Sequence, residues 1–211
     1  LNSTQWNTNM HLFTNSGSPN GKRVGIFMNE KNIDIPKTEI DLRAGENLSE
    51  DYIAKNFIGR VPGLELDDGT FLAESQAICR YLEAKHPEPN LFGTTGEEQA
   101  IIEMWSRRVE INVLIPVAQG FRNITGFFKD RETCVKEWGE VSVDLARDAV
   151  THFDQHLENN QFLMGDRYCI ADMTFAILIG FAKNVGQDFL DMPSIKRFHD
   201  EVTSRDAFKK T

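Results

Sequence analysis

The stretch that most constrains this chain is residues 59–78, where short apolar runs alternate with turn signals. Gly63–Leu66 and Phe71–Ala73 are apolar, and Asp67-Asp68-Gly69 lies between them. Asp-Gly between two apolar runs is a strong signal for a β-hairpin. Apolar residues then recur at helical spacing over residues 77–82. The stretch therefore predicts a strand, a tight turn, a strand and a helix.

Two positions in this stretch are suited to a ligand. Pro62 has no N–H for a sheet, so we expect it at a strand start or edge, with a cis bond as one option. A proline there leaves the backbone groups of Val61 free. Ser75 falls at the start of the predicted helix, where free N–H groups and the helix dipole favour a carboxylate.

The order of these residues resembles the glutathione-binding half of the cytosolic glutathione transferases. In that family the element reads Val-Pro, an apolar strand, Asp-Gly, an apolar strand, Glu-Ser and then Ala-Ile. The corresponding pairs here are Val61-Pro62, Asp68-Gly69, Glu74-Ser75 and Ala77-Ile78. The alternative is a generic hairpin followed by a helix.

Composition argues against several other classes of protein. The 211 residues suit one large domain or two small ones, and 40% hydrophobic residues permit a sizeable core. A net charge of −9 argues against a nucleic-acid surface, which needs clustered positive charge. No apolar run approaches the roughly 20 residues that span a bilayer. The polar residues 1–9 lack the basic start and apolar core of a secretory signal.

The cysteines and histidines are sparse. Cys79, Cys134 and Cys169 form an odd, scattered set, which favours free thiols and a reducing compartment such as the cytoplasm. His152 and His156 have i, i+4 spacing, but no third ligand accompanies them. We therefore expect no metal and no prosthetic group.

The N-terminal half predicts an α/β order. Met10–Thr14 is a strand candidate, a helix follows from Lys22 to about Asn32, and Asp34–Leu42 is a second strand. Together they form a βαβ unit. Asp51–Phe57 predicts a short helix, and the helix after the hairpin should end near Lys85. The complete order is thioredoxin-like, as the resemblance also implies.

The C-terminal half predicts helices only. Residues 87–96 are rich in Pro, Gly and Thr, which is typical of a linker. The helical patterns that follow are Glu97 to about Gly120 with a kink at Pro116, Glu132–Leu157, the almost wholly apolar Ile170–Ala182, and Pro193–Val202. We therefore expect an α/β thioredoxin-like domain over residues 10–86 and an all-helical domain over 97–211.

The segment before the apolar helix is a second landmark. In the family it usually reads Gly-x-x-Ser/Thr-Ile/Val-Ala-Asp, and the hydroxyl residue and the Asp form a capping box. Cys169 replaces the hydroxyl residue here, so about 1 kcal/mol of capping is expected to be lost. We interpret Asp172 as structural and Cys169 as a buried cap. The alternative is a reactive thiol at a helix start.

The resemblance places activation of the glutathione thiol after the first strand. Lowering a thiol pKa by about two units takes about 2.7 kcal/mol, which one or two hydrogen bonds supply. The Ser/Thr-Pro-Asn-x-x-Arg/Lys-Val pattern of bacterial and fungal transferases related to the nu class is similar to residues 18–24. It implies Ser18 as the thiol donor, with Asn20 beside it. The alternatives are that Ser18 only caps the helix, or that Ser16 is the donor, as in the delta and theta classes. No tyrosine or cysteine stands in this loop, which disfavours the mechanisms that use them.

The resemblance carries the other glutathione contacts over by position. The backbone of Val61, before Pro62, should pair with the cysteinyl part, as a strand would. Glu74 should hold the γ-glutamyl amine, and Ser75 its carboxylate.

The remaining expected contacts depend on the family geometry alone. Asn47 and Arg60 are candidates for the glycyl end of glutathione. The second-substrate pocket should lie between the two halves, along the first long helix, with Trp105, Arg108 and Asn112 as possible lining residues. Ordinary packing or a solvated surface is the alternative for each of these three.

The sequence thus predicts a cytoplasmic glutathione transferase that joins glutathione, as co-substrate, to a small hydrophobic electrophile. The resemblance also implies a homodimer, with no nucleic-acid or membrane partner. One alternative is a glutathione-dependent disulfide reductase. The other is a non-catalytic module of the same fold that only binds glutathione, because a fold does not fix a function.

Overall fold

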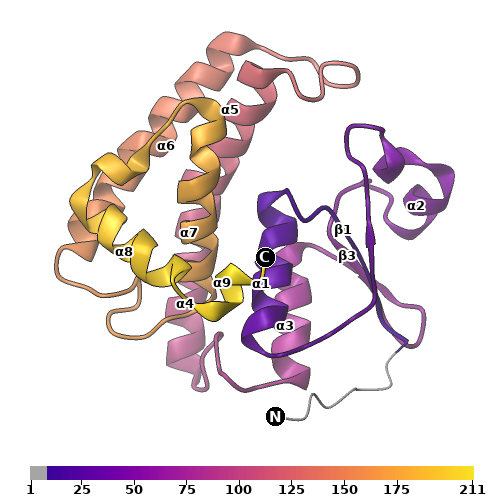
Figure 1. Ribbon diagram of the computed structural model, residues 1–211, viewed down its shortest axis with the longest axis horizontal. Coiled ribbons are helices and arrows are strands. Elements are labelled where there is room, and N and C mark those ends of the chain that lie inside the picture. The colour runs from indigo at the N-terminus through magenta and orange to yellow at the C-terminus, as the bar shows by residue number, and fades with distance from the viewer. Residues whose placement is uncertain (1–8) are drawn as a thin grey trace. The chain divides into compact units, whose positions relative to one another are not determined.

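The structure is a computed structural model that describes residues 9–211. The prediction that the polar residues 1–9 are not a secretory signal therefore concerns residues that lie almost wholly outside the described part of the chain. The chain divides into two compact units (Figure 1). One contains the residues up to Pro89 together with Asp206–Thr211, and the other contains Asn90–Arg205. The thioredoxin-like and helical architectures predicted from the sequence are both present.

The first unit is built on a four-stranded sheet in the order β2-β1-β3-β4. β1 (His11–Thr14) runs parallel to β2 (Lys37–Glu39) and antiparallel to β3 (Gly63–Glu65). β3 and β4 (Phe71–Ala73) form the predicted hairpin. The parallel pair confirms the βαβ unit, and the hairpin completes the mixed sheet of a thioredoxin-like fold.

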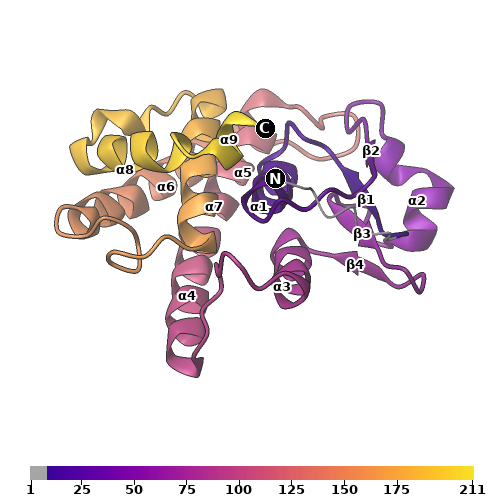
Figure 2. The same cartoon turned by 60° about the horizontal axis from the view of Figure 1, so that its bottom comes forward.

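Helices cover both faces of this sheet. α1 (Pro19–Glu30) and α3 (Ser75–Lys85) pack together on one face, and α2 (Glu50–Lys55) lies on the other, after the short 3-10 turn η1 (Glu46–Leu48) (Figure 2). The core between helices and sheet contains fully buried side chains, among them Phe27, Leu64, Ile78 and Leu82.

Two boundaries differ from the sequence prediction for local reasons. α1 begins at Pro19 rather than at Lys22, because Ser18 caps the helix and a proline fits the first helical turn. β2 covers only Lys37–Glu39 of the predicted Asp34–Leu42. Pro36, immediately before β2, has no N–H to donate to the sheet.

The last residues belong to the first unit, whereas residues 97–211 were expected to form the helical domain. The short helix α9 (Asp206–Lys209) packs on α1. The Asn29 side-chain amide donates to the Ala207 carbonyl at 3.0 Å and to the Thr211 hydroxyl at 2.9 Å. A long-range contact of this kind leaves no periodic signal in the sequence.

The second unit contains no strand among its described residues and consists of helices with two short 3-10 turns. Its elements are α4 (Gly96–Val109), η2 (Glu110–Leu114), α5 (Ile115–Thr125), α6 (Lys136–Leu157), α7 (Ile170–Phe181), η3 (Ala182–Val185), η4 (Phe189–Asp191) and α8 (Pro193–Thr203). α7 contacts both α4 and α8, and its residues Ile170–Ile179 are all buried. The prediction of a buried central helix is confirmed.

The first long helix is interrupted just before Pro116. η2 is a π-helical stretch in which the Ile115 N–H donates to the Glu110 carbonyl, five residues back. Pro116 has no N–H to continue the α-helical pattern, and it occupies the first turn of α5. The predicted kink therefore takes the form of a local change of hydrogen-bond register.

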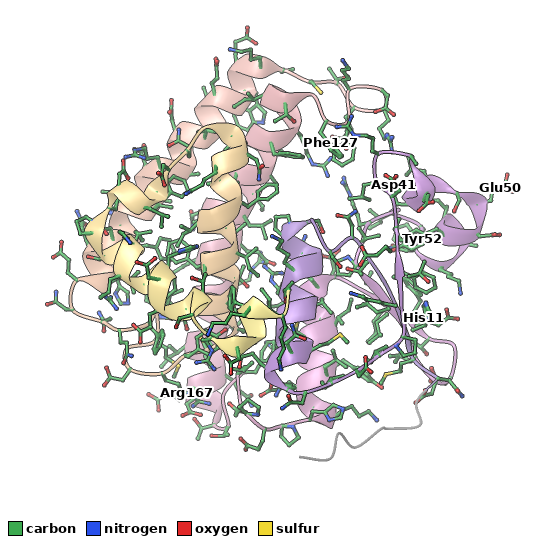
Figure 3. All side chains as sticks on the ribbon, viewed as in Figure 1. His11, Asp41, Glu50, Tyr52, Phe127 and Arg167 are labelled. Carbon is green, nitrogen blue, oxygen red and sulfur yellow. The ribbon has the colours of Figure 1, made fainter. Side chains whose placement is uncertain are left out.

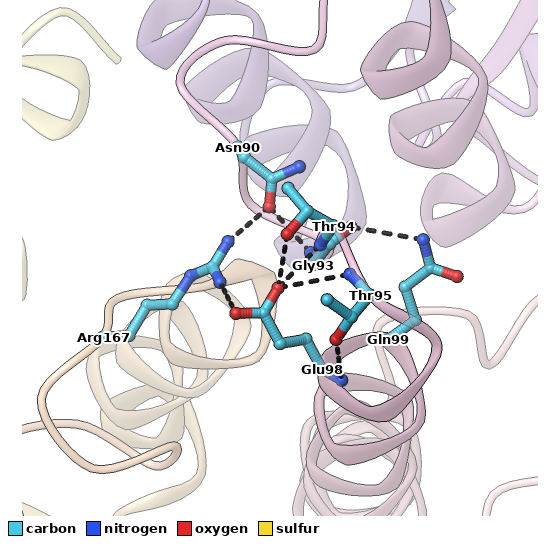
Figure 4. Close-up of polar contacts among 7 residues, drawn as sticks. All are labelled: Asn90, Gly93, Thr94, Thr95, Glu98, Gln99 and Arg167. Carbon is cyan, nitrogen blue, oxygen red and sulfur yellow. Dashed lines mark hydrogen bonds and ion pairs between the residues drawn. The ribbon is translucent and has the colours of Figure 1, made fainter.

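A polar cluster fixes the start of α4 (Figure 4). The Thr95 hydroxyl accepts the Glu98 N–H at 3.2 Å, and the Glu98 carboxylate accepts the N–H and hydroxyl of Thr94, each at 2.8 Å. Arg167, from the loop before α7, pairs with Glu98 at 2.6 Å and donates to Asn90. The hydrogen bonds from Thr94, with Arg167, lower the pKa of Glu98 to about 2.

The start of α7 shows the predicted capping box. The two carboxylate oxygens of Asp172 accept the N–H groups of Cys169 and Leu163, each at 2.8 Å. Burial raises the pKa of Asp172 to about 6. The Cys169 thiol is fully buried, and burial raises its pKa, so the structure favours the buried cap over a reactive thiol.

Candidate functional site

Two of the expected thiol donors, Ser16 and Ser18, lie in the loop between β1 and α1, and Ser18 has two partners. Its hydroxyl donates to the Asn15 carbonyl at 2.8 Å and accepts the Gly21 N–H at 3.1 Å. Both bonds close the first turn of α1. The catalytic role of Ser18 stays a prediction, and it requires the hydroxyl proton to turn away from Asn15.

Gly21 allows this loop to pack closely on the helix. A Cβ at Gly21 would lie 2.0 Å from the Asn15 carbonyl oxygen and 2.9 Å from the Thr14 hydroxyl oxygen. No side chain fits at that distance, so the loop geometry depends on a glycine at this position.

Ser16, the alternative donor, is bound to a carboxylate. Its N–H donates to Glu39 at 2.9 Å, and its hydroxyl makes a short hydrogen bond to the other Glu39 oxygen. Burial raises the pKa of Glu39, but the bonds from Ser16, with Lys37, outweigh it and leave that pKa below its ordinary value. A neighbouring negative charge disfavours a thiolate, so this environment is the less suitable one.

Asn20, on α1, is the third expected thiol donor, and its side-chain amide differs from the two serines in its hydrogen bonds. Arg23 Nη1 donates to the Ser75 hydroxyl at 2.7 Å, and that hydroxyl donates to Asn20 Oδ1 at 3.2 Å. Within residues 9–211, Asn20 Nδ2 has no hydrogen-bond partner. Sequence reasoning treated Arg23 only as part of a motif. Its i, i+3 spacing from Asn20 on one helix was the available signal.

The backbone beside Pro62 is open, as predicted. The Val61-Pro62 peptide bond is cis, and β3 begins one residue later, at Gly63. The N–H and carbonyl groups of Val61 have no hydrogen-bond partner in the described part of the chain. They are therefore available to an extended ligand, which would pair with them as a strand does.

The start of α3 offers an anion site. Glu74 is its N-cap residue but makes no side-chain cap bond, so the N–H of Ser75 points out of the helix without an intrahelical acceptor. Glu74 itself has φ +66°, a left-handed conformation that costs a non-glycine residue about 1–3 kcal/mol. Its carboxylate is exposed directly beside the helix start.

The two candidates for the glycyl end differ in their surroundings. The Arg60 carbonyl accepts from the hydroxyl of Tyr52, which is labelled in Figure 3, and from the Asn56 amide, each at 2.7 Å. The Arg60 guanidinium is exposed and unpaired within residues 9–211. Asn47 is buried, and its amide donates to the Gly59 carbonyl at 2.7 Å. Arg60 is thus free to meet a carboxylate, whereas Asn47 braces the loop.

A pocket of about 390 Å³ lies within the helical unit. It is lined by Trp105, Arg108, Asn112, Ala149, His152, Phe153 and His156. The first three are residues expected at a second-substrate pocket between the two halves, and the structure brings them together, but in a pocket whose lining residues all belong to the helical unit. The other four come from α6 and were not predicted as lining residues. The i, i+4 spacing of the two histidines was the signal that could have found them.

The pocket walls are aromatic and carry one cation. The Arg108 guanidinium lies 4.6 Å from the centre of the Trp105 ring, and the His156 ring lies 4.5 Å from the same ring. His156 Nε2 is 3.0 Å from the Leu163 carbonyl, so this nitrogen carries the hydrogen. Phe153 is 6.0 Å from Trp105. Such a wall suits a hydrophobic or aromatic small molecule.

A metal site and a membrane-spanning helix both have no candidate among the described residues. In residues 9–211, no three His, Cys, Asp or Glu side chains come together in a way that could hold a metal ion. None of the described helices is both long enough and apolar enough to cross a membrane.

The fold and this open backbone edge define a recognised class. A thioredoxin-like unit with a cis-proline before β3 and an open start of α3, followed by a helical unit, is the architecture of the glutathione transferases. The sequence matches the glutathione S-transferase N-terminal domain over residues 12–90 and the glutathione S-transferase C-terminal domain over residues 141–206. The chain belongs to the glutathione S-transferase family.

Similar proteins agree with this assignment over nearly the whole chain. Glutathione S-transferase 2 of Saccharomyces cerevisiae is 33% identical over 95% of this chain and 88% of its own length. The crystal structure of Gtt2 from Saccharomyces cerevisiae has a TM-score of 0.86 at 31% identity, covering 95% of this chain and 99% of that chain. A glutathione S-transferase of class Gtt2 from Vibrio parahaemolyticus has a TM-score of 0.83 at 38% identity, with 94% and 95% covered.

Proposed function

We propose that this glutathione S-transferase joins the thiolate of glutathione to small hydrophobic electrophiles in a detoxifying reaction. The open start of α3 beside the unpaired Val61 backbone is the observation that carries the proposal. These groups match the two ends of a γ-glutamyl-cysteinyl segment, a carboxylate and an extended backbone. The unpaired cysteines are consistent with a reducing compartment, and we propose the cytoplasm.

Glutathione binding follows from the charges along this edge. The γ-glutamyl carboxylate would accept the Ser75 N–H at the positive end of α3. The exposed Glu74 carboxylate would hold the γ-glutamyl amine. Val61 would pair with the cysteinyl backbone, and the unpaired Arg60 guanidinium would meet the glycyl carboxylate.

Two side chains compete for the role of thiol donor. The Asn20 amide has free N–H groups, whereas the single proton of Ser18 is held by Asn15. We therefore favour Asn20 as the principal donor, with Ser18 as a second donor if its hydroxyl turns. A hydrogen bond to a charged acceptor contributes about 1.5–3 kcal/mol, or roughly one to two units of thiol pKa.

The electrophile is assigned to the pocket that Trp105, Arg108 and Asn112 share with α6. Its aromatic walls supply apolar area, and its polar groups are few, which is the usual composition of a small-molecule site. The chemistry itself takes place on the glutathione sulfur. No metal or prosthetic group is needed to attack an electrophilic carbon with a thiolate.

A homodimer is part of this proposal. Trp138, Val141 and Leu145 are each about half exposed, at i, i+3 and i+7 along α6. Met104, Ile111 and Ile115 are similarly exposed on α4, η2 and α5. Apolar side chains repeated along one helix face favour burial against a partner. A second copy of this chain presents the same apolar surface, so the partner can be an identical chain.

The test is a calorimetric titration with reduced and then oxidised glutathione, followed by turnover of an aryl halide. Binding of reduced glutathione with turnover supports the transferase. Tighter binding of oxidised glutathione with turnover of a disulfide identifies the reductase instead. Binding without any turnover identifies a non-catalytic module.

Comparison of Asn20→Ala with Ser18→Ala assigns the donor. Asn20→Ala should lower kcat by about 10- to 100-fold at neutral pH, from the loss of one charge-assisted hydrogen bond. Ser18→Ala should mainly cost about 1 kcal/mol of helix capping. A large loss of rate with Ser18→Ala, and none with Asn20→Ala, reverses the assignment.

A further inference from the structure

We propose that Arg23 is a positioning residue that sets, through Ser75, the direction in which the Asn20 amide faces. In this arrangement the Asn20 NH₂ group, rather than its oxygen, is presented to the glutathione sulfur. The inference rests on the proposed role of Asn20 as thiol donor and extends it to a residue that does not touch the sulfur.

The Arg23 guanidinium is buried where it meets Ser75. Arg23 is 2% exposed and lies on α1, where its Nη1 is 2.7 Å from the Ser75 hydroxyl oxygen. A guanidinium has donors only, so Ser75 must accept this hydrogen bond. Ser75 is itself 5% exposed, so water does not readily replace the arginine.

The Ser75 hydroxyl has a single proton to donate. Because a Ser75 lone pair is used by Arg23, its proton is free to point to Asn20, whose Oδ1 lies 3.2 Å away. Only the oxygen of an amide accepts a hydrogen bond. Arg23 thus biases the amide, whose two flipped states are of nearly equal shape, toward the state in which its oxygen faces Ser75.

The orientation of the Asn20 amide decides which of its two polar groups a ligand meets. With Oδ1 held by Ser75, Asn20 Nδ2 is directed elsewhere, and within the described chain it has no partner. An NH₂ group in that position stabilises a thiolate, whereas the flipped amide would present a carbonyl oxygen and repel it. Removal of Arg23 frees the Ser75 hydroxyl to turn, so that it accepts from Asn20 as readily as it donates, and the bias against the flipped amide is lost.

A direct electrostatic effect of Arg23 has to be separated from this relay. The positive charge near the start of α3 would itself favour a thiolate, with or without Asn20. The two explanations differ in a double-mutant cycle. An effect that passes through Asn20 disappears when Asn20 is replaced, while a direct effect of the charge persists.

The experiment measures the apparent pKa of the bound thiol in the full chain, from its thiolate ultraviolet absorbance at saturating glutathione. The variants are Asn20→Ala, Arg23→Met, Arg23→Lys and the double variant Asn20→Ala/Arg23→Met. We expect Asn20→Ala and Arg23→Met each to raise the apparent pKa by about one unit, a tenfold loss of thiolate at lower pH. The double variant should match Asn20→Ala, and Arg23→Lys should stay close to wild type.

Three outcomes overturn the inference. If Asn20→Ala raises the pKa but Arg23→Met does not, Arg23 does not position the amide and the proposed function stands. If the two effects add, the charge acts directly. If Asn20→Ala has no effect while glutathione still binds, Asn20 is not the donor, and the proposed thiol chemistry fails with the relay.

A second variant keeps the test decisive if Arg23→Met does not fold. Ser75→Ala breaks the same link by removing one oxygen atom. Its effect on the thiol pKa at saturation, alone and with Asn20→Ala, gives the same cycle. Melting curves of all variants separate loss of fold from loss of position.

Discussion

The ammonium nitrogen of Lys31 lies 2.7 Å from the Glu83 carboxylate, and the lysine side chain is completely buried. The same nitrogen donates to the carbonyls of His86, at 2.6 Å, and Pro89, at 2.9 Å. Two donors of the ammonium thus satisfy carbonyls at and after the end of α3, and its charge is paired with Glu83 on the same helix. A single charge ties the end of α1 to the end of α3.

Lys31→Met should therefore destabilise the protein by about 3–5 kcal/mol, because it removes the ammonium from the buried ion pair with Glu83 and the donor for two carbonyls. Urea unfolding monitored by circular dichroism measures this difference. Lys37→Met is the matched control, since Lys37 is 58% exposed in its pair with Glu39 and should change stability by less than about 1 kcal/mol. Equal effects of the two variants would contradict the role of the buried pair.

Asp172 should make stability depend on pH in an unusual direction. Its folded pKa, about 6, lies above the ordinary value of 3.8, so the folded state holds the proton more tightly. The contribution is complete below the ordinary pKa and is lost as the pH rises through about 6, a difference of about 2.7 kcal/mol for two pKa units. Asp172→Asn removes this dependence. Unfolding free energies at several pH values from 4 to 7 should give a wild-type minus variant difference that falls with pH; a constant difference would contradict the prediction.

Glu98 should make the stability of the protein depend on pH in the opposite direction. Hydrogen bonds from Thr94, with Arg167, hold its pKa at about 2, so its contribution is present above the ordinary value of 4.5 and is lost as the pH falls towards 2. Glu98→Gln should lower the melting temperature at pH 7 and have progressively less effect on acidification. The exposed neighbour Glu97 offers the control Glu97→Gln. This variant should leave the melting temperature nearly unchanged at pH 7 and on acidification.

Replacement of the two adjacent arginines of α4 should have different effects on the KM for the electrophile. Arg108 lines the pocket, whereas Arg107 pairs with Glu110 at 2.7 Å and does not line it. Arg108→Met should raise KM for an aromatic electrophile by roughly 3- to 10-fold, from the loss of about 0.5–1.5 kcal/mol of contact. Arg107→Met should not. The KM for glutathione should be unchanged in both variants, and a rise for glutathione alone would place the electrophile elsewhere.

Leu145 tests the proposed dimer. Replacing it by Glu puts a charge in the middle of the exposed apolar stripe of α6, and a buried unpaired charge is strongly unfavourable. Sedimentation velocity should show a dimer for the wild type and a monomer for Leu145→Glu, with unchanged circular dichroism. Asp144→Gln, at the exposed neighbouring position, should remain dimeric. A monomeric wild type at micromolar concentration would refute the homodimer.

The sequence was most informative where structure is decided locally. The hairpin of residues 63–73, the end of α3 at Lys85 and the apolar α7 all follow from turn chemistry or periodicity within a short window. The capping box at Asp172 was also visible, because its partners are three residues apart. Element ends shifted by a few residues where a proline or a cap determined them.

The unpredicted features join residues that are distant in the sequence. The Arg23–Ser75 bond spans 52 positions, and the α6 wall of the pocket becomes apparent only when α4 and α6 lie side by side. The docking of residues 206–211 on α1 is of the same kind. Periodicity shows which face of a helix is apolar, but it does not show which element will cover that face.

The left-handed backbone of Glu74 implies a conflict between the stability of the fold and the binding of glutathione. Glycine at this position would relieve the conformational strain and make the chain harder to unfold, by about 1 kcal/mol. The same change would remove the carboxylate proposed to hold the γ-glutamyl amine. Selection of variants for thermal stability alone should therefore favour Glu74→Gly, and the stabilised variants should bind glutathione poorly.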